Sequence, residues 1–122
     1  MNSLHASDLH IDVSMPEENC VELRWSGKSD QPHPEVFLNP FLDTVLQYAG
    51  HAEIRIRFGD LSFLNSATLP CIVYFLNKAL DRDAIVRLIY NERVNWQRAV
   101  FSGLASVYSK RNFILDGTGA AE

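Results

Sequence analysis

The sequence predicts a single α/β domain built around a mainly parallel or mixed β-sheet of four to five strands, with helices packed chiefly on one face. Strand-like and helix-like stretches alternate along the chain, and the clearest change from one to the other lies near residue 60. Polar and apolar residues alternate over residues 53–58, as in a strand with one buried face. Over residues 69–80, apolar residues recur at three- and four-residue steps, as in an amphipathic helix. Strands that alternate with helices are typical of parallel sheets.

Five short stretches have the composition and alternation of strands. They cover residues 9–13, 20–25, 53–58, 84–90 and 112–115. Residues 15–19 are expected to be the turn between the first two strands. The polar residues 1–8 and the small residues 117–122 are expected to be flexible, because neither stretch has a pattern that could be buried. The folded domain is therefore predicted to span residues 9–116.

Three helices are predicted. Asn39 followed by Pro40 is typical of a helix start, because proline is tolerated at the first helical position, and Gly50 is suited to end that helix. The third helix is expected to bury one apolar stripe. Its members are Trp96, Ala99, Val100, Gly103, Leu104 and Val107.

The segment before the second helix contains the candidate functional residue. Asn65, Ser66 and Thr68 can each cap a helix, so this helix is expected to begin between Asn65 and Leu69, with Pro70 in its first turn. Asp60 is expected to shape the preceding polar turn. A phosphate on Ser66 would lie near unpaired helix amides, which favour it by about 0.3–1 kcal/mol. The simpler interpretation is that these residues only cap the helix.

From Ile54 to about Val107 the chain resembles the STAS domain family, the fold of the bacterial anti-sigma factor antagonists. The resemblance lies in the strand, the segment from Leu61 to Leu69, the helix, the strand of residues 85–90 and a further helix. In that family an Asp-Ser-Ser-Gly tetrad carries the phosphoacceptor serine of a partner kinase. The matching serine here is Ser66.

The other three positions of the tetrad differ from the family pattern, with Asn65, Ala67 and Thr68 in place of Asp, Ser and Gly. An Asn-Thr-Ser-Ser tetrad occurs in the SiaC-like regulatory phosphoproteins, and the segment from Pro34 to Tyr48 also resembles that group. Its members act with a kinase, a phosphatase and a diguanylate cyclase.

The resemblance implies a non-enzymatic bacterial regulatory phosphoprotein that acts by partner switching. Its partners would be a serine/threonine protein kinase of the anti-sigma-factor type and a PP2C-type phosphatase. Ser66 is the implied phosphorylation site, with Thr68 as the reserve acceptor. The implied partner-binding residues are Asp60, Asn65, Ser66, Ala67, Thr68 and Tyr74. The alternative is a SiaC-like activator of a diguanylate cyclase.

Length and composition fit one such domain. The 122 residues are 47% hydrophobic and 21% charged, enough for one core but not for a second domain. A formal net charge of −4 without any block of Lys and Arg argues against a nonspecific nucleic-acid binder. The sequence has no bilayer-spanning apolar run and no signal-peptide pattern, so we expect a cytoplasmic protein.

Arginines occupy the polar positions of three predicted strands. They are Arg24, Arg55, Arg57 and Arg87. If the strands are neighbours and helices cover only one side of the sheet, these side chains share the open face. There they either bind a nucleotide, another small ligand or an acidic partner, or pair across strands with Glu22 or Glu53. The pairing is the simpler interpretation, because no phosphate-binding loop accompanies the arginines.

No catalytic or metal-binding pattern is evident. The four histidines, His5, His10, His33 and His51, lack the spacing of helical metal ligands, so they are expected to be solvated, with no metal or cofactor. Cys20 and Cys71 are expected to be reduced and buried. Tyr74 and Phe75, beside the apolar stripe of the second helix, are either core residues or a partly exposed docking surface.

Overall fold

The computed structural model describes residues 3–109 and 112–118, which form one sheet with helices packed against it. In this part of the chain the strands are β1 (Leu4–Ala6), β2 (Leu9–Glu17), β3 (Cys20–Ser29), β4 (Glu53–Leu64), β5 (Val86–Ile89) and β6 (Phe113–Asp116). The helices are α1 (Glu35–Ala49), α2 (Leu69–Leu80) and α3 (Asn95–Ala105).

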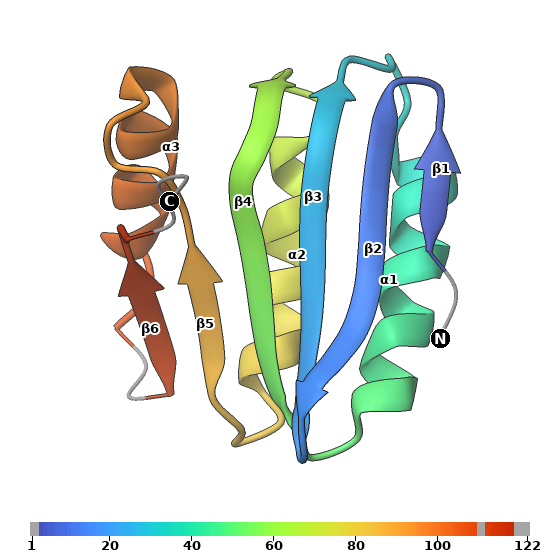
Figure 1. The fold of residues 1–122 in the computed structure, drawn as a ribbon, viewed down its shortest axis with the longest axis vertical. Helices are drawn as coiled ribbons and strands as arrows, with labels where there is room; N and C mark the ends of the chain where they lie inside the picture. The colour runs from blue at the N-terminus through green and yellow to red at the C-terminus, as the bar shows by residue number, and fades with distance from the viewer. Residues whose placement is uncertain (1–2, 110–111, 119–122) are drawn as a thin grey trace.

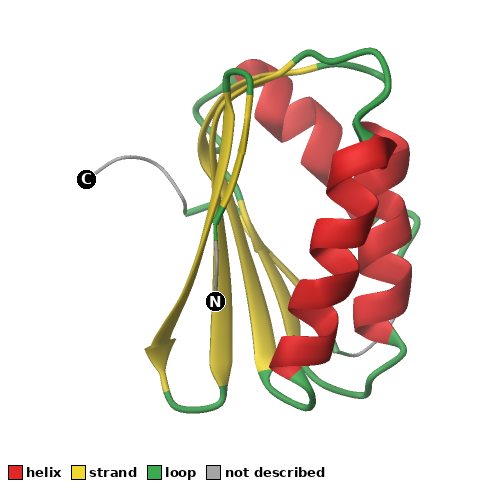
Figure 2. Cartoon of the chain, turned by 90° about the vertical axis from the view of Figure 1, so that its right-hand side faces the viewer, coloured by secondary structure: helices red, strands yellow, loops and turns green. Residues whose placement is uncertain are grey.

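The strands follow one another in the sheet in chain order, from β1 to β6. β1, β2 and β3 pair antiparallel, whereas β3, β4, β5 and β6 pair parallel. Seen edge-on in Figure 2, the helices all lie on one side of the sheet and the other side is open. The predicted α/β class and one-sided helix packing are therefore confirmed, with six strands among the described residues in place of four to five.

The core lies between the sheet and the helices. Its largest fully buried side chains include Trp25 of β3, Phe58 of β4 and Phe101 of α3. The Phe58 and Phe101 rings stack with centroids 4.5 Å apart, and the Trp25 ring lies 5.1 Å from Phe58. Burying each such side chain contributes about 1.5–3 kcal/mol, so this cluster fixes α3 firmly on β4.

The N-terminal residues are more ordered than the sequence indicated. Leu4–Ala6, expected to be flexible, form β1 and pair with β2 through a two-residue loop in which Ser7 has φ 56°. Three residues are too few to show a period in the sequence. At the other end, Thr118 forms a β-bridge with Asn91, and the rest of the expected flexible tail, residues 119–122, lies outside the described residues.

Helix α1 begins earlier than predicted. It starts at Glu35 after Pro34, so Pro40 lies inside the helix and not at its first position. Leu38, in the early turns, is fully buried, and this packing outweighs the hydrogen bond that Pro40 cannot donate. The predicted end is confirmed, because Gly50 has φ 58° and its N–H bonds to Leu46.

Strand β4 is twice as long as predicted. Residues 59–64, expected to form a polar turn, continue the strand, and the pairing of β3 with β4 shifts register between Arg24 and Ser26 and again between Gly27 and Lys28. Such bulges interrupt the period of two that identifies a strand in a sequence. Asp60 is therefore a strand residue and does not shape a turn.

The predicted apolar face of α3 is rotated from the observed one. Gln97 and Phe101 are the fully buried residues of this helix, whereas Ala99, Gly103 and Val107 of the expected stripe are exposed. Trp96, Val100 and Leu104 of the stripe do pack against the core, so the prediction is confirmed for these three residues and wrong for the other three.

Candidate functional site

The candidate site is the turn of residues 65–68, which joins β4 to α2. Asn65 fastens this turn to the neighbouring strand and loop: its backbone N–H donates to Ser29 O at 2.9 Å, and its side-chain Nδ2 donates to Gln31 O at 2.9 Å. An aspartate could not donate the second bond. The asparagine therefore holds the β3–α1 loop beside the turn.

Thr68 is the second anchor. Its side chain is fully buried, and its Oγ1 donates to Asn65 Oδ1 at 2.6 Å, so that it is free to accept from Ser29 Oγ at 2.6 Å. The Thr68 backbone N–H also donates to Asn65 Oδ1, at 3.1 Å. A hydroxyl so enclosed cannot enter another enzyme's active site, which argues against Thr68 as the reserve acceptor.

Ser66 lies between these anchors, and its side chain is exposed. Within residues 3–109 and 112–118 its hydroxyl makes no hydrogen bond, and the backbone N–H groups of Ser66 and Ala67 are also unpaired. Helix α2 begins at Leu69 with Pro70 in its first turn, as predicted. The turn therefore presents one free hydroxyl to solvent while its neighbours hold the backbone in place.

Helix α2 is fixed to the core beneath the turn. Phe75 is buried, so the core interpretation of this residue is confirmed. Tyr74 is half-buried: its hydroxyl donates to Asp43 Oδ2 at 3.3 Å and accepts from Lys78 Nζ at 2.6 Å. The bonds of Lys78 to Tyr74 and to Asp43 raise the pKa of Lys78, and the bonds of Tyr74 and Lys78 to Asp43 link α2 to α1.

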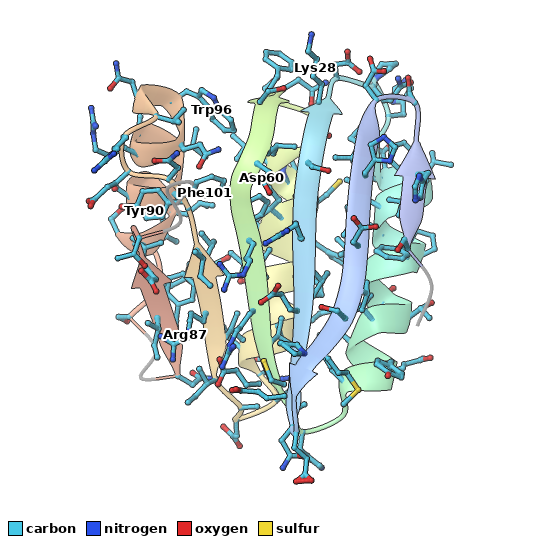
Figure 3. The ribbon with its side chains drawn as sticks, in the orientation of Figure 1. Lys28, Asp60, Arg87, Tyr90, Trp96 and Phe101 are labelled. Carbon is cyan, nitrogen blue, oxygen red and sulfur yellow. The ribbon has the colours of Figure 1, made fainter. Side chains whose placement is uncertain are left out.

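Asp60 is separated from the other predicted partner-binding residues. It is exposed on the open face of the sheet, as Figure 3 shows, and lies 3.7 Å from Arg24 Nε. Ser66 lies between the end of β4 and the start of α2, and α2 packs on the other side of the sheet. The predicted set therefore divides into the turn, Tyr74 on the helical side and Asp60 on the opposite face.

The arginines of the open face are paired with carboxylates, as the simpler interpretation predicted. Arg55 Nε lies 2.8 Å from Glu53 Oε2, Arg87 Nε lies 3.4 Å from the same oxygen, and Arg57 Nε lies 2.9 Å from Glu22 Oε1. Burial disfavours the Glu53 carboxylate, but its bonds to Arg55 and Arg87 outweigh this and lower its pKa. The arginine charge is thus satisfied within the sheet, which weakens the case for a nucleotide site there.

Gln97 is a structural anchor that the sequence did not reveal. Its Nε2 donates to Phe58 O at 2.8 Å and to Leu61 O at 2.9 Å, and its Oε1 accepts from the Asn91 N–H at 2.8 Å. The ladder between β4 and β5 ends at Arg57 and Ile89, and beyond this point Gln97 donates to two backbone carbonyls of β4. A glutamine in the first turn of a helix is not distinctive in a single sequence.

The two cysteines match the prediction, whereas two of the histidines do not. Cys20 and Cys71 are free and buried, as expected, and burial raises the pKa of both thiols. His5 and His10, expected to be solvated residues of termini and loops, are cross-strand neighbours on β1 and β2. Among the described residues no group of three or more His, Cys, Asp and Glu could hold a metal ion, and no helix could cross a membrane.

Comparison with known proteins identifies the fold. No family model and no curated protein matches the sequence. A solved anti-sigma factor antagonist from Mycobacterium paratuberculosis superposes with a TM-score of 0.67 at 16% identity, covering 94% of this chain and 92% of that one. The chain has the anti-sigma factor antagonist fold. The fold implied by the STAS resemblance is thereby confirmed.

Two structures of the antagonist SpoIIAA agree with this assignment. The unphosphorylated form superposes with a TM-score of 0.56 at 20% identity, covering 75% of this chain and 81% of that one. The phosphorylated form from Bacillus gives a TM-score of 0.59 at 20% identity, covering 86% and 89%. Identities this low establish the common fold, and the role of Ser66 stays a prediction.

Proposed function

We propose that this chain is a non-enzymatic regulatory protein that acts by partner switching, with Ser66 as its phosphoacceptor. The observation that carries the proposal is the exposed, unbonded Ser66 hydroxyl at the β4–α2 turn of an anti-sigma factor antagonist fold. The neighbouring Thr68 hydroxyl is buried and doubly bonded, so the turn offers one accessible acceptor.

The solved relatives support a phosphate-dependent role. SpoIIAA has been solved in a phosphorylated and an unphosphorylated form, so a protein of this fold carries a phosphate. By analogy, the partner of this chain is an anti-sigma factor that acts as a serine/threonine kinase. A PP2C-type phosphatase resets Ser66, and activation of a diguanylate cyclase remains the alternative output.

The switching mechanism is electrostatic. A phosphate adds about −1.5 to −2 charges and three acceptor oxygens at neutral pH. This charge is stabilised by the positive end of the α2 dipole and by the unpaired N–H groups of Ser66 and Ala67. A partner that covers the turn with an apolar or acidic surface would lose affinity, because it would have to desolvate the new charge.

The surroundings of Ser66 favour an acceptor over a catalytic nucleophile. An activated serine needs a base within hydrogen-bond reach of its hydroxyl. Within the described ranges no side chain bonds to Ser66. The hydroxyl is therefore presented to the active site of another protein, which would supply the base.

Phosphorylation can be tested with the kinase that copurifies with this chain from its native cell. Wild type, Ser66→Ala and Ser62→Ala are incubated with ATP and the kinase, and intact mass is measured. Ser62 is the matched control, because it is an exposed serine of β4 whose hydroxyl donates to Gly27 O at 2.8 Å. We expect one phosphate on wild type and Ser62→Ala, and none on Ser66→Ala. Equal uptake by all three would remove Ser66 from the mechanism.

A further inference from the structure

The hairpin at the N-terminal edge of the sheet brings two histidines together. His5 of β1 and His10 of β2 are direct partners in the antiparallel ladder. The adjacent pairs, Leu4 with Ile11 and Ala6 with Leu9, turn Ile11 and Leu9 into the core, so both imidazoles lie on the open face of the sheet. Figure 1 shows this hairpin at the edge of the sheet, away from α2 and its preceding turn.

The two imidazole rings bring one nitrogen each to within hydrogen-bond distance of the other. The Nδ1 atoms lie 2.9 Å apart, and the rings are perpendicular, with centroids at 4.6 Å and an interplanar angle of 88°. Metal ions bind histidine nitrogens at about 2.0–2.1 Å, and two such nitrogens at a right angle about the ion would be about 2.9 Å apart. The observed separation therefore equals that of two adjacent ligands in a square-planar or tetragonal site.

We propose that His5 and His10 form a two-imidazole chelate for a divalent transition-metal ion that favours tetragonal geometry, of the Cu²⁺ or Ni²⁺ kind. Imidazole suits both ions, square-planar or tetragonal geometry is typical of them, and Cu²⁺ binds most tightly among first-row divalent ions. Without metal, one Nδ1–H donates to the other Nδ1. On binding, that proton is carried by Nε2 instead, so both Nδ1 lone pairs are available.

The remaining coordination positions belong to solvent. Within the described residues no third His, Cys, Asp or Glu completes a metal cluster. His5 is exposed and His10 half-buried, so an ion reaches the pair directly from water. The site is therefore an exchangeable surface chelate that would tie β1 to β2, and it is independent of the role proposed for Ser66.

The test is calorimetric titration of the whole protein with CuCl₂ and with NiCl₂ in a non-chelating buffer. Wild type is compared with His5→Gln and His10→Gln, which keep a polar side chain at each exposed position. His51→Gln is the matched control, because His51 is an exposed histidine outside the hairpin. We expect one ion per chain in wild type and His51→Gln, and a loss of affinity of about tenfold or more in each hairpin variant, because one imidazole cannot chelate.

A second measurement locates the ion. Substoichiometric Cu²⁺ should broaden the amide NMR signals of β1 and β2 first, and the broadening should disappear in either hairpin variant. Far-UV circular dichroism shows whether the variants keep the fold. Equal affinity in all four proteins, loss in only one of the two hairpin variants, or broadening centred on another histidine would overturn the proposal.

Discussion

The two halves of β4 are held in different ways. In the first half, residues 53–57 pair in register with β3 and residues 54–57 with β5, and the arginines on the open face form ion pairs with carboxylates. In the second half, the register with β3 shifts twice and the pairing with β5 has ended, and side chains from other elements bond to the backbone there. Gln97 bonds the freed carbonyls, while Asn65 and Thr68 hold the turn that follows.

This difference concentrates the stability of the candidate site in a few side chains. A regular ladder distributes its bonds over many backbone groups, so replacement of one side chain leaves most of them intact. In the bulged half, each anchor satisfies two or more buried groups, and an unsatisfied buried group costs about 1–3 kcal/mol. We therefore expect larger effects from neutral substitutions in the second half than from charge removal in the first.

The largest expected effect is that of Gln97→Leu. The substitution leaves the Phe58 and Leu61 carbonyls and the Asn91 N–H without their side-chain partner. We expect the free energy of unfolding in urea to fall by about 3 kcal/mol or more. Gln47→Leu on the exposed side of α1 is the control, with a change within about 0.5 kcal/mol. Equal effects of the two variants would contradict the anchoring role.

The two hydroxyls of the turn should differ in the same assay. Thr68→Val keeps the shape of the side chain but leaves Ser29 Oγ without its partner and removes one of the two donors to Asn65 Oδ1, for an expected loss of about 1–3 kcal/mol. Ser66→Ala removes an exposed, unbonded hydroxyl and should change stability by less than about 0.5 kcal/mol. If Ser66→Ala lowered the free energy of unfolding more than Thr68→Val, the assignment of Thr68 as the anchor and Ser66 as the free hydroxyl would be wrong.

In the regular half, Glu53 should contribute a pH-dependent increment of stability. Its carboxylate bonds to Arg55 and Arg87, and its pKa is lowered by folding. The contribution is therefore complete above the pKa of the unfolded chain and is lost as pH falls through the lower pKa of the folded protein. Between pH 6 and pH 3, Glu53→Gln should lose less stability than wild type. Parallel pH curves would show that Glu53 does not contribute.

The smallest effect is expected at Asp60. Its 3.7 Å ion pair with Arg24 joins side chains that are each more than half exposed, and such pairs are worth about 0–1 kcal/mol. Asp60→Asn should leave the urea midpoint nearly unchanged and should not affect phosphate uptake. A large effect on partner affinity would instead return Asp60 to the partner-binding surface.

The sequence predicted most of the fold because the spacing of its apolar residues changes clearly from a period of two residues, typical of strands, to one of 3.6 residues, typical of helices. Residues 53–58 and residues 69–80 show this directly, and the positions of Pro70 and Gly50 fixed a helix start and a helix end. The failures share one cause, which is tertiary packing that outweighs a local signal. Pro40 lies inside α1 because Leu38 in the early turns is buried, and β4 continues through bulges that interrupt its alternation.

The candidate site was only partly predictable. The position of Ser66 between a strand and a helix was evident from the sequence. Which residues of the turn anchor it and which one has a free hydroxyl was not. Whether Thr68 is free or buried depends on Ser29, which lies 39 residues earlier in the chain. The histidine pair was missed for a similar reason: β1 is three residues long, and its register with β2 cannot be inferred without the strand itself.

The measurement that tests switching most directly is the affinity of the copurified kinase partner for this chain before and after phosphorylation of Ser66. The proposed function predicts that the dissociation constant rises by about tenfold or more when Ser66 carries the phosphate, because the charge falls within the docking surface. Ser66→Ala should bind like the unmodified protein. Equal affinities of the phosphorylated and unmodified forms would contradict partner switching at Ser66.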